Sequence, residues 1–455
     1  MKRTFLLLFS LFSLVSLQAE NKVSLTLIPP GKITNKVDLD IRGGIVNESA
    51  SQQTYQVALY WNKENKDALL YETVVTIPAG KAETVILTKD RVGKNKVIFK
   101  VANEGKAYRK TKDIEVIESD IRSIQQISGA WTGIYHWSEI EGKHWNQDIK
   151  KMTDDQWREL IRSMNKLEMN MVVIQEVFRN EEYVGKHTTN VDNYVGKAFY
   201  PSKLYPGRME LTAKDPIEAI LTEADKQGMN VLMGVGMFAW FDFTPESLEW
   251  HKRVAKELWD MYGHHESFYA FYVSEESGGG LDNWEQRPEM RKKRKDDIVN
   301  FFKEFKAYCN ALAPDKPIML ATNSFEVPNG MDTYPALMEH LDILCPFGFA
   351  RMPDGDLTGK EAANMLQKVC DEAKAHLWFD LEVFLFNPDN SRPVEEIIRD
   401  LNLFDNFEKI LCYQFPGVFN DPKMSIRVGE ARTIDLFNGY MKYLKELKAK
   451  NKKRK

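Results

Sequence analysis

The sequence predicts a (β/α)8 TIM barrel, an α/β fold, preceded by a small all-β sandwich domain of immunoglobulin-like type. From about residue 123, apolar runs alternate with helical segments, a pattern typical of an α/β domain with a parallel sheet. Eight such runs occur, and they lack the clean polar–apolar alternation of strands that face water on one side. Residues 22–118 instead alternate with a period of two and contain no strong helical pattern, which is typical of antiparallel strands.

The first residues have the pattern of a secretory signal peptide. Met1-Lys2-Arg3 is basic, residues 5–17 are apolar, and the small residue Ala19 follows. The apolar run is shorter than the roughly 20 residues that a membrane helix needs. We therefore expect residues 1–19 to be removed and the protein to be exported, periplasmic or extracellular, without an integral membrane segment.

Charge and cysteine content argue against several classes of protein. The net charge is −4 over 455 residues, which argues against a nucleic-acid partner. The basic segment 448–455 is interpreted as a solvated tail, with a membrane or polyanion tether as the alternative. The cysteines show no CxxC spacing, so we expect buried free thiols, although export permits a disulfide. They are Cys309, Cys345, Cys370 and Cys412.

The N-terminal domain, residues 22–118, is predicted from four alternating runs with turn residues about every ten positions. These runs are residues 37–41, 55–61, 83–87 and 96–101. They contain no catalytic constellation. A spacer role is expected, with sugar binding as the alternative.

The barrel is predicted over residues 123–447. Its eight strands are expected at 128–135, 169–177, 229–238, 268–274, 316–323, 341–348, 375–383 and 409–415. Four helix starts are marked by capping residues: Thr153 with Gln156, Thr358 with Glu361, Asp215 before Pro216, and Thr244 before Pro245. An open doubly wound sheet is the alternative, but no glycine-rich phosphate-binding sequence follows the first strand.

Two of these strands end in carboxylates, at Glu275 and Glu276 and at Asp380 and Glu382. Catalytic groups of barrel enzymes lie at the C-terminal strand ends, and two carboxylates held there suffice to cleave a glycosidic bond. The other strand ends supply aromatic and polar side chains suited to a carbohydrate substrate, although each also fits an ordinary packing role. They are Trp131, Tyr135, His136, Trp137, Gln175, Glu176, Trp240, Asn323, Phe347, Tyr413 and Gln414.

Strand parity favours Glu276 over Glu275 as the catalytic acid. Alternate residues of a strand share a face, so Ala270, Tyr272 and Glu276 form one set, which is expected to face the cleft. Glu275 falls in the other set and remains the alternative acid. The insertions 179–212 and 278–294 are expected to wall the cleft. Their aromatic residues are candidate sugar platforms or packing residues: Tyr183, Tyr194, Tyr200, Tyr205 and Trp284.

These motifs resemble a known family. Tyr272-x-x-x-Glu276, together with Trp378-Phe379-Asp380-Leu381-Glu382, is similar to the glycosidase-like barrels of domain-of-unknown-function family 4434. That family is in turn similar to retaining glycoside hydrolases of the large TIM-barrel clan. The resemblance implies an acid/base glutamate ending strand four and a nucleophilic glutamate ending strand seven. It departs from the clan in lacking the usual Asn-Glu on strand four, where this chain has Ser274-Glu275-Glu276.

The sequence thus predicts an exported glycoside hydrolase of retaining mechanism, with Glu382 as nucleophile and Glu276 as acid/base and with no cofactor. Asp380 and Asn323 are expected to orient the nucleophile or bind hydroxyls, and Tyr413 to hydrogen-bond Glu382. A non-catalytic carbohydrate-binding protein is the main alternative, followed by a surface scaffold. Histidine–carboxylate metal hydrolysis is disfavoured because His136, His144 and His187 lack ligand spacing. A serine hydrolase is disfavoured by the missing Gly-x-Ser-x-Gly turn.

Overall fold

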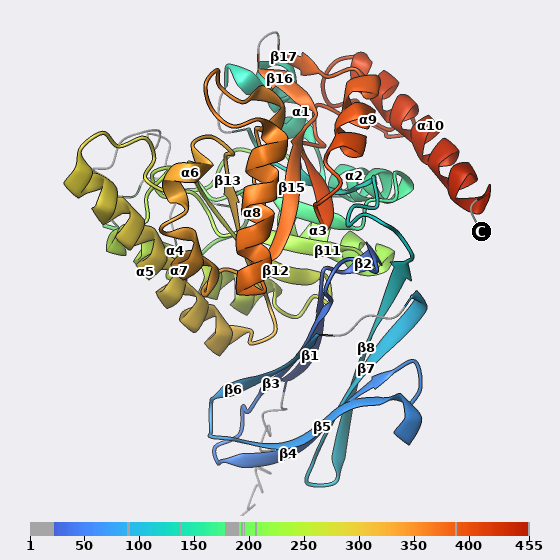
Figure 1. The fold of residues 1–455 in the computed structure, drawn as a ribbon, viewed down its shortest axis with the longest axis vertical. Coiled ribbons are helices and arrows are strands. Elements are labelled where there is room, and N and C mark those ends of the chain that lie inside the picture. Colours follow the sequence, from blue (N-terminus) through green and yellow to red (C-terminus); the bar gives the residue numbers. More distant parts are fainter. Residues whose placement is uncertain are drawn as a thin grey trace, which may run out of the picture.

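The computed structural model describes residues 22–88, 92–136, 139–177, 191–192, 194, 196–204, 207–386 and 389–453. Within them the chain forms an all-β domain and a closed barrel of eight strands (Figure 1). The predicted fold class is therefore confirmed. The predicted signal segment, residues 1–19, lies outside the described residues.

The all-β domain consists of two sheets. The three-stranded sheet has the order β1 (Lys22–Ile28), β3 (Asp40–Val46), β6 (Ala82–Thr88). The five-stranded sheet has the order β2 (Gly31–Thr34), β8 (Lys106–Ile117), β7 (Gly93–Asn103), β4 (Gln53–Trp61), β5 (Leu69–Ile77), with a short 3-10 helix, η1 (Lys66–Ala68), before β5. Alternate side chains such as Leu25, Val57 and Phe99 are buried between the sheets, as a period-two pattern requires.

All eight predicted barrel strands form, and every neighbouring pair is parallel. In order they are β9 (Ile127–Thr132), β10 (Met171–Ile174), β11 (Asn230–Gly234), β12 (Phe268–Ser277), β13 (Ile318–Thr322), β14 (Ile343–Leu344), β15 (His376–Glu382) and β18 (Lys409–Tyr413). The barrel closes where β9 pairs with both β10 and β18.

Helices surround the barrel, and their predicted start signals are present. They are α1 (Asn146–Lys151), α2 (Asp154–Lys166), α3 (Pro216–Gln227), α4 (Pro245–Tyr262), α5 (Pro288–Leu312), α6 (Val327–Gly330), α7 (Tyr334–Met338), α8 (Gly359–Ala373), α9 (Val394–Leu403) and α10 (Arg432–Lys453). Short 3-10 turns η2 (Glu141–His144) and η3 (Phe349–Arg351) and the hairpin β16 (Phe384–Phe386) and β17 (Asp389–Ser391) complete the described elements. Thr153 and Thr358 form full capping boxes, while Asp215 and Thr244 cap helices that begin with proline. No helix within the described ranges has the length and apolarity to cross a membrane.

Strand parity sorts the barrel side chains into an inner and an outer core. Ala270 and Tyr272 of β12 belong to the inner cluster, and Phe271 and Val273 belong to the outer cluster beneath the helices. The inner cluster takes side chains from all eight strands, so the barrel is packed rather than open as a pore. All four cysteines are buried and free, as expected.

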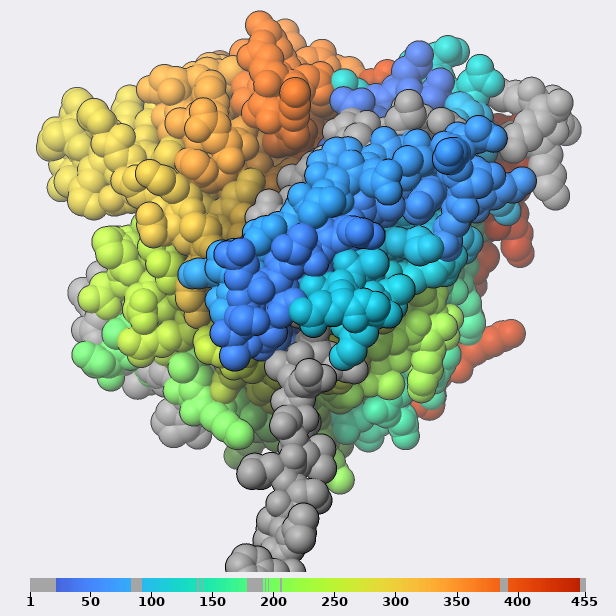
Figure 2. Space-filling view, turned by 90° about the horizontal axis from the view of Figure 1, so that it is seen from below, coloured from blue at the N-terminus to red at the C-terminus, as the bar shows by residue number. Residues whose placement is uncertain are grey.

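The all-β domain closes the floor of the barrel, by which we mean the end where the strands begin. Ile28, the last residue of β1, is fully buried within the inner cluster of the barrel itself. The hydroxyl of Tyr269, near the start of β12, donates to the carbonyl of Leu27 at 2.9 Å. Figure 2 shows the blue and cyan β-domain lying across the underside of the barrel. The domain is built into the barrel and is not merely tethered beside it.

Buried charges reinforce this floor. Arg42 of β3 pairs with Asp342, which precedes β14, at 3.0 Å, and Lys306 of α5 contacts the same carboxylate at 3.0 Å. Burial alone would raise the pKa of Asp342, but Arg42 and Lys306 hold it well below its usual range. The carboxylate therefore stays ionised between the two domains.

We expect Arg42→Ala to lower the free energy of unfolding by about 3 kcal/mol, because it leaves the buried Asp342 only partly neutralised. Folding lowers the pKa of Asp342, so its contribution to stability is present above the unfolded value of about 3.9 and is lost as the pH falls. Urea unfolding at pH 7 and at pH 3 measures both the loss and its pH dependence.

Arg109→Ala is the matched control, because Arg109 pairs with Glu64 at the surface of the β-domain. Its unfolding midpoint should change far less. Equal losses in the two variants would show that the pair between the domains adds nothing to stability.

Candidate active site

Glu275 and Glu276 are adjacent on β12, but their carboxylates contact different parts of the protein. Glu275 is fully buried, and its carboxylate accepts hydrogen bonds from the backbone N–H groups of Phe238 and, at 3.3 Å, Asp242. Nε2 of His251 lies 3.8 Å from the same carboxylate. Glu275 therefore anchors the loop that follows β11, and its oxygens are committed to the protein.

Glu276 lies close enough to Glu382 and Asp380 for their charges to interact. Its Oε2 accepts a 2.9 Å hydrogen bond from the indole N–H of Trp240. Burial raises the pKa of Glu276 to about 7, with a further contribution from the charge of Glu382, while Trp240 and Arg351 oppose the shift. A carboxyl group with this pKa is partly protonated at neutral pH, which a general acid requires.

Glu382, at the end of β15, is paired with a cation. Arg351, in the turn η3 after β14, contacts its Oε1 through Nε at 2.7 Å. The guanidinium also lies 5.0 Å from the ring centre of Phe325 and 5.9 Å from that of Phe347, distances typical of cation–π contacts. Burial raises the pKa of Glu382, and Arg351 offsets part of that rise. Of the two glutamates, Glu382 is the one that forms an ion pair with a cation.

Asp380 is the third carboxyl group of this site. It is buried, and its Oδ1 has no hydrogen-bond partner among the residues that the structure describes. Burial, together with the charges of Glu382 and Glu276, raises the pKa of Asp380 well above its usual value. The three groups are therefore close enough to influence one another, and we call the strand ends that carry Glu276, Asp380 and Glu382 the mouth of the barrel. Three ionised carboxylates side by side are unfavourable in a space of low dielectric constant, which is why burial and mutual repulsion raise the pKa values here.

The loops around Glu276 have an unusual backbone. Glu276, Trp240 and Phe241 have φ values of 54°, 52° and 60°, a left-handed region that large side chains seldom adopt. Leu281, Asn283 and Trp284, in the next loop, have φ values of 60°, 52° and 58°. Such residues cost on the order of 1–3 kcal/mol each and persist where the surrounding structure holds them. These six left-handed residues are Glu276 itself and members of the two loops that follow β11 and β12.

An aromatic wall stands beside Glu276. Trp240 stacks on Phe241 with ring centres 4.5 Å apart, and Phe241 meets Trp284 edge to face at 5.6 Å. The side chain of Trp284 remains 39% exposed. A sugar ring presents apolar C–H faces, so this wall supplies the type of surface that binds one.

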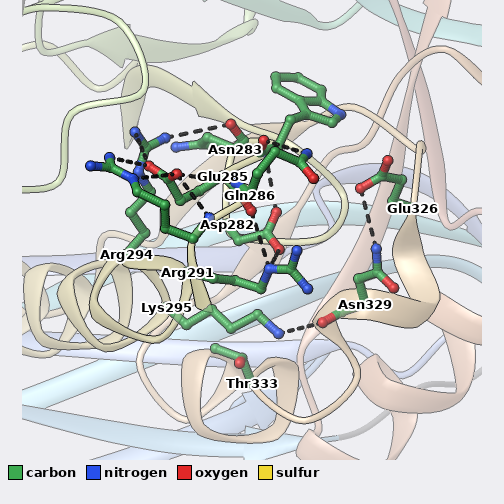
Figure 3. Close-up of polar contacts among 12 residues, drawn as sticks. Asp282, Asn283, Glu285, Gln286, Arg291, Arg294, Lys295, Glu326, Asn329 and Thr333 are labelled. Atoms are coloured by element: carbon green, nitrogen blue, oxygen red, sulfur yellow. Dashed lines mark hydrogen bonds and ion pairs between the residues drawn. The ribbon is translucent and has the colours of Figure 1, made fainter. Parts of the chain in front are cut away.

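A polar network holds the loop that bears Trp284 (Figure 3). Arg291 of α5 contacts Asp282 at 3.3 Å, and Arg294 contacts Glu285 at 3.2 Å. The side chain of Asn283 donates to the carbonyl of Phe241 at 3.3 Å, which links this loop to the preceding one. Side chains of helix α5 thus hold the loop that carries Trp284, and this loop in turn holds Phe241.

The predicted amides have mixed roles. Oδ1 of Asn323 accepts from the backbone N–H groups of Gly279 and Phe325, at 3.1 and 3.0 Å, so it supports loops. The hydroxyl of Tyr413 donates to Oε1 of Gln175 at 3.3 Å; the predicted bond from Tyr413 to Glu382 stays a prediction. Gln414 is buried, and its amide N–H donates to the carbonyl of Pro416 at 2.9 Å.

Several other predicted contacts are buried. Trp131 is 1% exposed and packs edge to face on Tyr272 within the inner core, so it lies beneath the mouth and does not form a stacking platform. Tyr135 is 4% exposed, donates to Glu139 and lies under Lys150, packing that does not support a sugar contact. His136 packs edge to face on Trp145 and Tyr413.

The remaining predicted residues divide by burial and by whether they are described. Glu176 is buried at the end of β10. Tyr194 stacks on Phe238, and Tyr200 donates to Glu257 at 2.6 Å, so both are packing residues. The others lie outside the described residues: Trp137, Tyr183, His187 and Tyr205.

Sequence reasoning missed Arg351 and its ring partner Phe325. Arg351 lies three residues beyond the predicted sixth strand. An arginine that closely follows one strand end, in a barrel whose other strand ends carry carboxylates, is the sequence signal that could have indicated an ion pair at this site.

The fold and these side chains define a class: a TIM barrel with a carboxylate-lined mouth. The chain belongs to the family described as "Domain of unknown function (DUF4434)", whose model matches residues 127–425. The predicted family is thereby confirmed. No curated protein matches the chain.

Among solved structures, similar chains include three glycosidases. A Bacteroides uniformis β-glucuronidase 2, covalently bound to cyclophellitol-6-carboxylate aziridine, is 12% identical with a TM-score of 0.41, over 86% of this chain and 45% of that one. A GH2 β-galacturonidase from Eisenbergiella tayi bound to galacturonate is 10% identical, with a TM-score of 0.40 and coverage of 93% and 73%. A putative β-galactosidase from Bacteroides fragilis is 9% identical, with a TM-score of 0.37 and coverage of 92% and 60%. The chain thus spans about half the length of the first of these.

We expect Glu276→Gln to stabilise the protein, and the gain to grow as the pH rises from 5 to 8. Folding raises the pKa of Glu276 to about 7, so ionising this group above its unfolded pKa of about 4.3 weakens the native state, by roughly 1–3 kcal/mol. Glutamine removes that penalty. Denaturant unfolding across this pH range measures the difference.

The control is Glu372→Gln on the exposed surface of α8. A pH dependence identical in both variants would contradict the raised pKa of Glu276.

Proposed function

We propose that this protein is a glycoside hydrolase that cleaves a glycosidic bond of a poly- or oligosaccharide by a retaining mechanism. The observation that carries the proposal is the pair of unlike glutamates in the mouth. Burial raises the pKa of Glu276 to about 7, whereas Glu382 is paired with Arg351. Retaining glycosidases use one protonated and one ionised carboxyl group that act on the same bond. The charge of Glu382 contributes to the raised pKa of Glu276, as expected for two groups of one site.

The reaction takes two steps. Glu382 attacks the anomeric carbon through a carboxylate oxygen, the bond from that carbon to the leaving oxygen breaks, and Glu276 gives its proton to the leaving oxygen. Glu276, now ionised, takes a proton from water. The water oxygen attacks the anomeric carbon and displaces Glu382, which restores both groups.

Arg351 and Asp380 support the nucleophile in different ways. The bond from Arg351 fixes one oxygen of Glu382 and favours its ionised form. Burial and the charges of Glu382 and Glu276 raise the pKa of Asp380 well above its usual value. In its protonated form Asp380 can donate a hydrogen bond to a sugar hydroxyl or to Glu382. Both are positioning residues in this scheme.

The wall of Trp240, Phe241 and Trp284 supports a carbohydrate as substrate. Its rings stand next to the proposed acid, so a sugar stacked there has its glycosidic oxygen near Glu276. The same wall would also serve a carbohydrate-binding protein without turnover, and a measurement of oligosaccharide binding beside kcat/KM separates the two functions.

We expect Glu382→Gln to abolish turnover and Glu276→Gln to slow it strongly, with activity of the latter restored on substrates that carry a good leaving group. The acid is needed to protonate poor leaving groups only, whereas the nucleophile is needed for all. A panel of aryl glycosides with leaving groups of graded acidity measures kcat/KM, and proton NMR of the first product assigns the anomeric configuration.

Glu372→Gln serves as the unaffected control. The wild-type kcat/KM should fall above about pH 7, where Glu276 loses its proton. Full activity of Glu382→Gln would refute the assignment. Binding of oligosaccharides without hydrolysis of any substrate would replace the enzyme by the carbohydrate-binding protein.

We also propose that the protein is exported, because residues 1–19 have the pattern of a cleaved signal peptide. Expression of the full chain in a bacterial host should yield protein outside the cytoplasm whose first residue is Glu20. N-terminal sequencing of the fractionated protein measures this, and an intact Met1 in the cytoplasmic fraction would contradict it.

A further inference from the structure

A second cluster of reactive side chains lies far from the mouth. It is formed by Glu218 and Asp225 of α3 and by His264 and His265, in the short segment between α4 and β12. This segment leads into the start of β12, whereas Glu276 lies at the other end of that strand. The cluster therefore plays no part in the proposed hydrolysis.

His265 is held in one orientation by carboxylates on both ring nitrogens. Its Nδ1 lies 2.6 Å from Oδ2 of Asp225, and its Nε2 lies 3.1 Å from Oε2 of Glu218. Asp225 is itself fixed, because its other oxygen accepts from the backbone N–H of Ser267 at 2.7 Å. His265 is 8% exposed, so this geometry is built into the fold.

His264 completes a group of three potential ligands. Its ring centre lies 4.2 Å from that of His265, and the ligand atoms of Glu218, His264 and His265 all lie within 4.8 Å of one another. The hydroxyl of Thr222 donates to Oε1 of Glu218 at 3.0 Å, which leaves Oε2 directed at His265. His264 is exposed, so the group is open to solvent.

The pattern matches the chemistry of a zinc site in two independent respects. Histidines that bind zinc commonly donate the other ring N–H to a carboxylate, which fixes the tautomer and the direction of the ring; Asp225 occupies that position. In addition, two ligands about 2.0–2.1 Å from a tetrahedral zinc ion lie roughly 3.3 Å apart. The 3.1 Å between Nε2 of His265 and Oε2 of Glu218 is close to this edge length.

We propose that Glu218, His264 and His265 bind one zinc ion, with Asp225 orienting His265 and a water molecule in the open fourth position. Nε2 of His265 and Oε2 of Glu218 then bond to the metal and not to each other. The site joins helix α3 to the segment that enters β12. Its role is structural, because it lies at the far end of β12 from Glu276.

The competing interpretation is a metal-free bridge, in which a protonated His265 pairs with both carboxylates. Such a bridge needs Glu218, Asp225 and His265 but makes no use of His264. The exposed His264 therefore distinguishes the two interpretations, and its replacement by alanine is the most informative change.

The test uses the untagged full chain, stripped with a chelator and then dialysed against Zn²⁺. We expect one bound zinc ion per chain and a higher Tm with zinc than without it. His264→Ala and Glu218→Gln should each weaken zinc binding by about 10-fold or more, and Asp225→Asn by about 10–100-fold. Calorimetric titration with Zn²⁺ measures these affinities, and the apo Tm shows that each variant folds.

His144→Ala is the matched control, because His144 pairs with a carboxylate, that of Glu430, at 2.9 Å and is not part of this cluster. It should bind zinc as the wild type does, and so should Glu382→Gln. Absence of zinc binding by the wild-type chain would overturn the proposal, as would wild-type affinity in His264→Ala. The first result would establish the metal-free bridge, and the second would show that zinc is held without His264. Both would leave the proposed hydrolase activity untouched.

Discussion

The alternation of side chains along the barrel strands is the constraint on which both the core and the mouth depend. On β12 it places Ala270 and Tyr272 inside the barrel and Phe271 and Val273 beneath the helices. At the strand end this alternation still directs Glu275 into the loop after β11. Glu276 then leaves the extended conformation, with a φ of 54°, and its carboxylate meets Trp240 at the mouth. A shift of one residue in register would move both glutamates, so the packed core fixes their positions.

Closure of the floor makes that core rigid. The inner cluster would otherwise end in open solvent beneath the strands, but Ile28 fills this position, and the pair of Arg42 with Asp342 holds the all-β domain against it. Burying three carboxyl groups at the opposite end is unfavourable, and such groups persist only in a frame that cannot relax around them. We infer that the all-β domain contributes to the mouth through this rigidity, without contacting it.

The sequence was sufficient to predict the barrel and its eight strands, because these rest on local pattern. Parity alone does not decide the direction of Glu276, since the backbone of this residue is left-handed and not extended. It was insufficient for Arg351, whose place beside Glu382 depends on the path of a turn after a two-residue strand. The sequence also did not reveal that Tyr135, which follows a strand closely, is covered by Lys150. Loop paths are decided by contacts between residues far apart in sequence, such as Asn283 with Phe241, and no local pattern encodes them.

The distribution of strain is the strongest physical reason to regard the mouth as a functional site. Trp240, Phe241, Glu276 and Trp284 all adopt left-handed backbone conformations that a glycine would accept more easily. A chain under no further constraint has no reason to keep large side chains at such positions. Here each of them either contacts a carboxyl group or forms the aromatic wall next to it. The strained backbone and the raised pKa of Glu276 thus have the same location, and this coincidence favours a functional site.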